Sequence, residues 1–79
     1  MKEYNDVELN ELIREGKDAT LKLSCIKTKK QTPQIKELLI FRRNRLSLIR
    51  KRATELNLTE TDLDNIHDYV QMKTRDIHP

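Results

Sequence analysis

Residues 34–56 read QIKELLIFRRNRLSLIRKRATEL, and this stretch decides the fold of the 79-residue chain. A helix turns by about 100° per residue, which brings the apolar side chains of the stretch into one sector about 100° wide. They are Ile35, Leu38, Leu39, Leu46, Ile49, Ala53 and Leu56. The pattern predicts one long amphipathic helix over residues 34–56. Arg42 points into the same sector, so we expect a kink near Asn44 or a partly wet site around the guanidinium.

A shorter helix is predicted before the long one, at about residues 6–15. Asn5 can cap its start, with Glu8 at the reciprocal position of a capping box. Leu9, Leu12 and Ile13 follow with helical spacing, and Gly16 suits a left-handed cap at the end.

A third helix is predicted at about residues 60–73. Thr59 and Asp62 have the spacing of a capping box at its start. Residues 57–59 then form a tight turn between two helices, and residues 74–79 are expected to be a flexible tail.

The segment 19–27 is the ambiguous part of the chain. Its partial alternation of apolar and polar residues is typical of a strand, but no second strand is available in the sequence to pair with it. We expect an extended connector, with a short helix capped by Asp18 or a strand completed by a second chain as alternatives. The sequence as a whole predicts a single small all-α domain of three helices over residues 1–79.

Charge is divided sharply along the chain, although the net charge is only +3. Residues 19–52 hold 11 lysines and arginines and one acidic residue, Glu37, whereas acidic residues outnumber basic ones in both flanks. Either the flanks fold back and neutralise this block, or the block is kept for an anionic partner such as nucleic acid.

Several cations of the block are expected to face outward from the long helix and to contact phosphates. Arg43 and Arg50 lie along one flank of the helix, Arg45 and Arg52 along the other, and Lys51 points away from the core. The predicted nucleic-acid contacts are Arg43, Arg45, Arg50, Lys51 and Arg52, supported by Lys27, Lys29 and Lys30 in the preceding loop.

Phe41 and Leu48 also lie off the core face, seven residues apart. They could pack under the first helix or form a contact with a dimer partner or another protein. The alternative function is therefore a small interaction module, an inhibitor or adapter that binds an acidic host protein through Phe41, Leu48 and a cationic rim.

The composition argues against an enzyme. One Phe, two Tyr and no Trp leave little bulk to line a substrate pocket, and a single glycine excludes a glycine-rich phosphate loop. His67, His78 and Cys25 are too scattered for a zinc site, so no metal or cofactor is expected. The lone cysteine and the absence of a signal-like or membrane-spanning segment predict a cytoplasmic protein.

Two stretches of the sequence resemble the small double-stranded-DNA-binding transcriptional regulator (DsbA) of T4-like phages. The first is ELNELIRE at residues 8–15, continuing through Asp18 to LKLS at 21–24; the second is RKRA at 50–53, EL at 55–56, LDNI at 63–66 and RDI at 75–77. Together they cover roughly half of the chain, and residues 26–44 are longer here than in the family pattern. The resemblance implies DNA contacts at Arg50 and Arg52, whereas contacts at Arg43 and Arg45 are expected from composition alone.

We therefore expect a non-enzymatic DNA-binding accessory or transcription-regulatory protein of phage or bacterial origin. It would act as a homodimer or through a larger transcription complex. RNA is a weaker expectation, since few aromatic side chains are available for base stacking.

Overall fold

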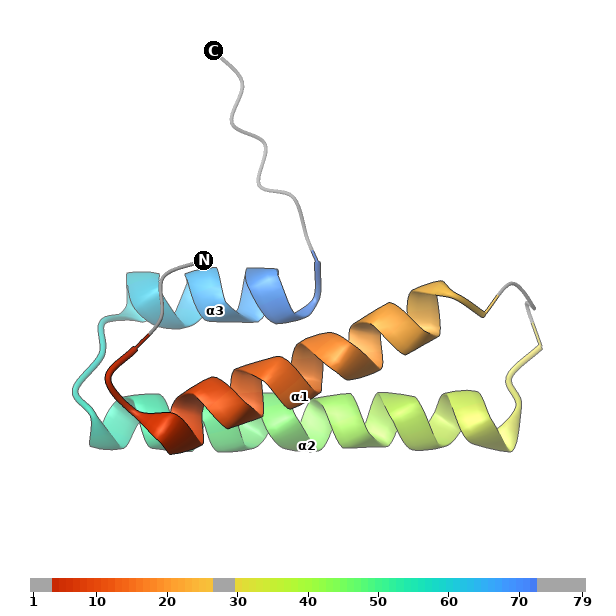
Figure 1. Cartoon of the computed structure of the whole chain (residues 1–79), viewed down its shortest axis with the longest axis horizontal. Coiled ribbons are helices and arrows are strands. Elements are labelled where there is room, and N and C mark those ends of the chain that lie inside the picture. Colours follow the sequence, from red (N-terminus) through yellow and green to blue (C-terminus); the bar gives the residue numbers. More distant parts are fainter. Residues whose placement is uncertain (1–3, 27–29, 73–79) are drawn as a thin grey trace, which may run out of the picture.

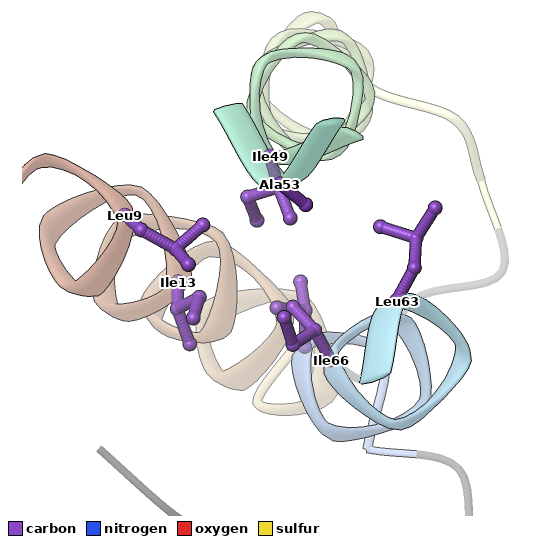
Figure 2. Packing of buried hydrophobic residues seen from close by; sticks show 7 residues of the cluster. Leu9, Ile13, Ile49, Ala53, Leu63 and Ile66 are labelled. Atoms are coloured by element: carbon purple, nitrogen blue, oxygen red, sulfur yellow. The ribbon is translucent and has the colours of Figure 1, made fainter. Parts of the chain in front are cut away.

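The computed structural model describes residues 4–26 and 30–72, and this part of the chain forms three helices (Figure 1). Helix α1 spans Val7–Ser24, α2 spans Pro33–Glu55 and α3 spans Glu60–Val70. In Figure 2, which looks nearly along α2, α1 and α3 lie side by side on the same side of α2. The predicted all-α architecture of three helices is confirmed.

The hydrophobic core lies where all three helices meet, and its side chains point toward one another in Figure 2. It consists of Leu9 and Ile13 from α1, Ile49 and Ala53 from α2, and Leu63, Ile66 and Val70 from α3. Each large side chain contributes about 1.5–3 kcal/mol through burial. Because α3 has 11 residues and α2 has 23, the core covers only the C-terminal half of α2. Ile35, Leu38 and Leu39, predicted on the core face, are accordingly only half-buried.

Helix α2 begins and ends within one residue of the predicted boundaries. The Thr32 side chain accepts a hydrogen bond from the Ile35 amide at 3.3 Å, and Pro33 occupies the first turn. The helix runs without interruption through Asn44, so the predicted kink is absent. Arg42 instead lies in a partly buried site, where it donates a hydrogen bond to the Thr20 hydroxyl at 3.4 Å.

The turn between α2 and α3 is closed by backbone hydrogen bonds. Asn57 adopts a left-handed conformation with φ of 59°. The Leu58 amide donates to the Ala53 carbonyl at 3.0 Å, and the Asn57 amide donates to the Thr54 carbonyl at 3.1 Å. These two bonds form a Schellman motif, which satisfies carbonyls that the end of a helix leaves free.

Helix α3 starts as predicted, with a complete capping box between Thr59 and Asp62. It ends at Val70 rather than near residue 73. The Gln71 amide donates to the His67 carbonyl, and Met72 turns the chain with φ of 57°. The tail predicted at residues 74–79 lies outside the described residues.

Helix α1 differs most from expectation. Asp6 rather than Asn5 caps its start, accepting a hydrogen bond from the Leu9 amide at 2.8 Å. The helix continues to Ser24, so residues 19–24 are helical and the expected extended connector is wrong for them. The reason is packing: Ala19 and Thr20 follow Gly16 with helical spacing, and all three are buried. Residue 27 lies outside the described residues.

Gly16 lies inside α1 rather than at its end, because the helix approaches α3 closely there. A Cβ atom at this position would lie 2.9 Å from Cγ1 of Val70, closer than side-chain carbons normally come. The Thr20 hydroxyl donates to the Gly16 carbonyl at 3.2 Å within the same contact. Glycine is therefore used here for close packing and not for a left-handed cap, which corrects the sequence prediction.

Candidate nucleic-acid interface

Three cations lie in one line along α2: Lys36, Arg43 and Arg50. They are seven residues apart, a spacing that drifts by only about 20° per step around a helix and covers about 21 Å from first to last. Lys51 adjoins them on the outermost side of the helix. All four side chains are exposed, and none has an ion-pair partner among the residues that the structure describes. We call Lys36, Arg43, Arg50 and Lys51 the basic stripe.

The outer side of α2 is open along its length. Helices α1 and α3 both pack on one side of α2 (Figure 2), and the Arg43 and Lys51 side chains are exposed. A helix with its side chains is about 10–12 Å across, and the major groove of B-DNA is about 12 Å wide. The exposed helix therefore has dimensions that suit insertion into that groove.

Arg52 belongs to the opposite flank of α2, where α1 packs. Its guanidinium holds both oxygens of the Asp6 carboxylate, with Nε 3.1 Å from Oδ1. It also lies 3.3 Å from carboxylate oxygens of Glu8 and Glu55. These contacts raise the pKa of Arg52 and lower the pKa of Asp6, for which the Arg52 hydrogen bonds matter most and the Leu9 amide next. Arg52 thus joins the start of α1 to the end of α2.

Arg45 is likewise turned toward α1. Its Nε lies 3.2 Å from the Glu15 carboxylate, although the N–H is not aligned for a hydrogen bond. The guanidinium is stacked on the Phe41 ring at 4.3 Å, and Nη1 donates to the Asn44 side chain at 2.7 Å. The acidic flank of the sequence therefore neutralises Arg45 and Arg52 but leaves the basic stripe exposed.

Of the three lysines predicted in the loop before α2, the structure describes one. Lys30 is exposed just before α2, whereas Lys27 and Lys29 lie outside the described residues. Of the predicted phosphate contacts, the structure groups Arg43, Arg50 and Lys51 on one surface. Lys36 was missed by the sequence reasoning, although its seven-residue spacing from Arg43 was a usable signal.

Helix α3 presents the opposite charge. It carries Glu60, Asp64 and Asp68 on its solvent side, where Glu60 and Asp64 are exposed and Asp68 is half-buried. In a helix–turn–helix pair the second helix often enters the groove of DNA, but carboxylates would repel phosphates here. The candidate nucleic-acid face is therefore the first helix of the pair, α2.

His67 lies between these two charged surfaces. Its Nε2 is buried without a hydrogen-bond partner among the described residues, so the side chain is less solvated than a surface histidine. Burial lowers the pKa of His67, and the nearby Arg50 lowers it further, while Asp64 and Asp68 oppose the shift. A change of charge at Arg50 should therefore change the pKa of His67.

Two of the three aromatic rings of the chain already carry a cation on one face, and the third packs against the core. Phe41 is stacked with Arg45, and the Lys17 ammonium lies 4.0 Å from the centre of the Tyr69 ring. Tyr4 packs against the core. These contacts involve every aromatic residue of the chain, one Phe and two Tyr.

The predicted protein contacts, Phe41 and Leu48, are each 37% exposed. Phe41 lies beside α1, whereas Leu48 is three residues before Lys51 on the helix surface. Among the described residues, no group of three His, Cys, Asp or Glu side chains is placed to hold a metal ion. Within residues 4–26 and 30–72, no helix has the length and apolar character needed to cross a membrane.

Comparison of the chain with protein-family models, with curated proteins and with solved structures found no match.

Proposed function

We propose that this protein binds double-stranded DNA through the basic stripe on α2 and acts as a transcription-regulatory or accessory protein. The observation that carries the proposal is the lack of ion-pair partners, among the described residues, for the four cations of the stripe. Carboxylates of α1 and its N-cap neutralise other arginines of the same helix. Exposed guanidinium and ammonium groups in a line are suited to successive phosphates.

Duplex DNA is favoured over single strands because the chain has only three aromatic residues, and two of their rings already hold a cation on one face. Phe41 and Tyr69 each have a cation on one face of the ring, which leaves only the other face for the base stacking that single-stranded nucleic acids use. A duplex needs no stacking from the protein. The regulatory role and the phage origin follow from the resemblance to the phage regulator, and pairing into a homodimer from the Phe41 and Leu48 stripe; all three are part of the proposal.

The test is a binding titration with a labelled random-sequence duplex, by fluorescence anisotropy at several salt concentrations. Four phosphate contacts give a slope of log K against log salt of about −3.6, since each contact adds about −0.9. Arg43→Gln with Arg50→Gln should weaken binding by about tenfold or more and reduce the steepness of the slope by about 1.8.

The matched control is Arg14→Gln with Lys22→Gln, which removes the same net charge from exposed positions on α1. This control should bind within about twofold of the native chain, because counterions are released where cations contact phosphates and distant surface charges are screened by salt. Equal weakening by both double variants would mean a diffuse charge effect and would count against a defined interface. Failure of the native chain to bind duplex would end the proposal and leave an acidic protein as the partner of the basic stripe.

A further inference from the structure

A groove of about 1020 Å³ lies between the C-terminal half of α1 and the N-terminal half of α2. Leu21, Leu38 and Phe41 provide much of its apolar lining, and no residue of α3 contributes to it. Leu21 is 43% exposed and Phe41 37% exposed, so these side chains are open to a partner. Helix α3 does not extend along this half of the helix pair (Figure 1).

The polar lining of the groove is mainly acidic. It contains three carboxylates, from Glu15, Asp18 and Glu37, and one ammonium group, from Lys22. Glu15 lies against Arg45 and Asp18 is paired with Lys22 at 3.1 Å. Glu37 is exposed and has no ion-pair partner among the described residues. It is also the one acidic residue in the basic block 19–52.

This charge pattern selects among possible occupants. A second copy of the chain, packed about a two-fold axis, would bring a second unpaired Glu37 into the same interface, and like charges disfavour that arrangement. DNA would be repelled by the same carboxylates. A helical segment with apolar residues on one face and a lysine or arginine beside them matches both the apolar walls and Glu37.

We infer that the groove binds an amphipathic helical segment of a partner protein, with a basic side chain of that segment against Glu37. On a helical wheel, the groove residues of α2 lie about 180° from the line of Lys36, Arg43 and Arg50. Binding here therefore goes beyond the proposed DNA contact and leaves the basic stripe free.

The experiment uses the full chain and a labelled synthetic peptide of about 12 residues, roughly 18 Å long as a helix, with leucines on one face and lysines on the other. Binding is measured by anisotropy, and the site is mapped from amide shifts in two-dimensional NMR spectra. The changes in amide chemical shift that the peptide causes should be largest at Leu21, Leu38 and Phe41. The same peptide with glutamate in place of lysine should bind this groove about tenfold more weakly.

Two variants test the residues directly. Glu37→Lys should lower the affinity for the leucine–lysine peptide by about fivefold to tenfold. Asp64→Lys, an equal charge change on α3, should leave that affinity within about twofold of the native value. Leu21→Lys should abolish the amide shifts that the peptide causes at the groove residues. Circular dichroism checks that the Leu21→Lys variant remains folded. Arg43→Gln with Arg50→Gln should not alter peptide binding, so failure of the DNA proposal is separable from failure of this one.

Three results would overturn the inference: shifts outside the groove, equal sensitivity to Glu37→Lys and Asp64→Lys, or equal binding of both peptides at the groove. Sedimentation of the chain alone gives a further check. A dimer that Leu21→Lys converts to a monomer would show that a second copy, and not a partner helix, covers the groove.

Discussion

Gly16 of the first helix and Val70 of the last pack so closely that Cγ1 of Val70 lies 2.9 Å from the position that a Cβ on Gly16 would take. Val70 is fully buried, so its branched side chain has little freedom to move away. This contact fixes how closely α1 approaches α3.

Gly16→Ala is predicted to destabilise the protein by about 1 kcal/mol. Overpacking against Val70 costs about 1–3 kcal/mol, and the better helix propensity of alanine offsets about 1 kcal/mol of that. Urea denaturation measures the difference. In a Val70→Ala background the clash is gone, so adding Gly16→Ala should then stabilise the protein. A stabilising effect in both backgrounds would disprove the close contact.

Asn57 should tolerate glycine but not alanine. Its φ of 59° is a left-handed conformation that costs an ordinary residue about 1–2 kcal/mol and glycine almost nothing. Asn57→Ala is expected to lower the free energy of unfolding by about 1 kcal/mol, and Asn57→Gly to leave it equal or higher. Thermal melts measure both variants, and Thr61→Ala, at an exposed position on α3, serves as the reference substitution. Equal stability of the alanine and glycine variants would contradict the left-handed turn.

Asp6 should make stability depend on acid pH. Its pKa is lowered from the usual 3.8 by Arg52 and the Leu9 amide, so the unfolded chain takes up the proton first as the pH falls. The stabilisation is present at neutral pH and is lost as the pH drops below about 4 toward the lowered pKa of the folded state. Asp6→Asn keeps an N-cap but loses the charge. Its melting temperature should lie below that of the native chain at pH 7, and the difference between the two should shrink as the pH falls below 3.8. A difference that stays constant with pH would contradict the prediction.

His67 offers a spectroscopic test of the basic stripe. Its pKa is lowered from 6.5 by burial and by Arg50, so Arg50→Gln should raise it. Phosphate bound at Arg50 should raise it as well, because the anion offsets the cation. An NMR titration of His67 with and without duplex DNA measures both effects. An unchanged pKa in saturating duplex would place the DNA away from Arg50.

Local signals in the sequence were enough to predict α2 and the start of α3. Thr59 and Asp62 act on neighbouring amides, so their roles can be recognised without knowledge of the tertiary fold. Gly16 could not be interpreted in this way. A glycine near the end of an apolar pattern suits either a cap or a close contact, and the choice depends on Val70, which is remote in the sequence.

The candidate interface was predictable only in part, for a similar reason. The helical wheel separates Arg43 and Arg50 from Arg45 and Arg52, but it does not reveal which flank α1 covers. That depends on the crossing of α1 and α2, which brings acidic side chains of the N-terminal region to the second pair. The groove could not be predicted from the sequence either, because its lining requires α1 to continue to Ser24 beside the N-terminal half of α2.

Because α3 is shorter than α2, the two halves of α2 should differ in local stability. Amides around Ile49 and Ala53 lie in the three-helix core, so they should exchange with solvent deuterium only through global unfolding. Amides near Leu38 are protected by a two-helix layer alone and should exchange through smaller, more frequent openings. The half of the protein that carries the groove is thus the half able to adjust its shape without unfolding the rest.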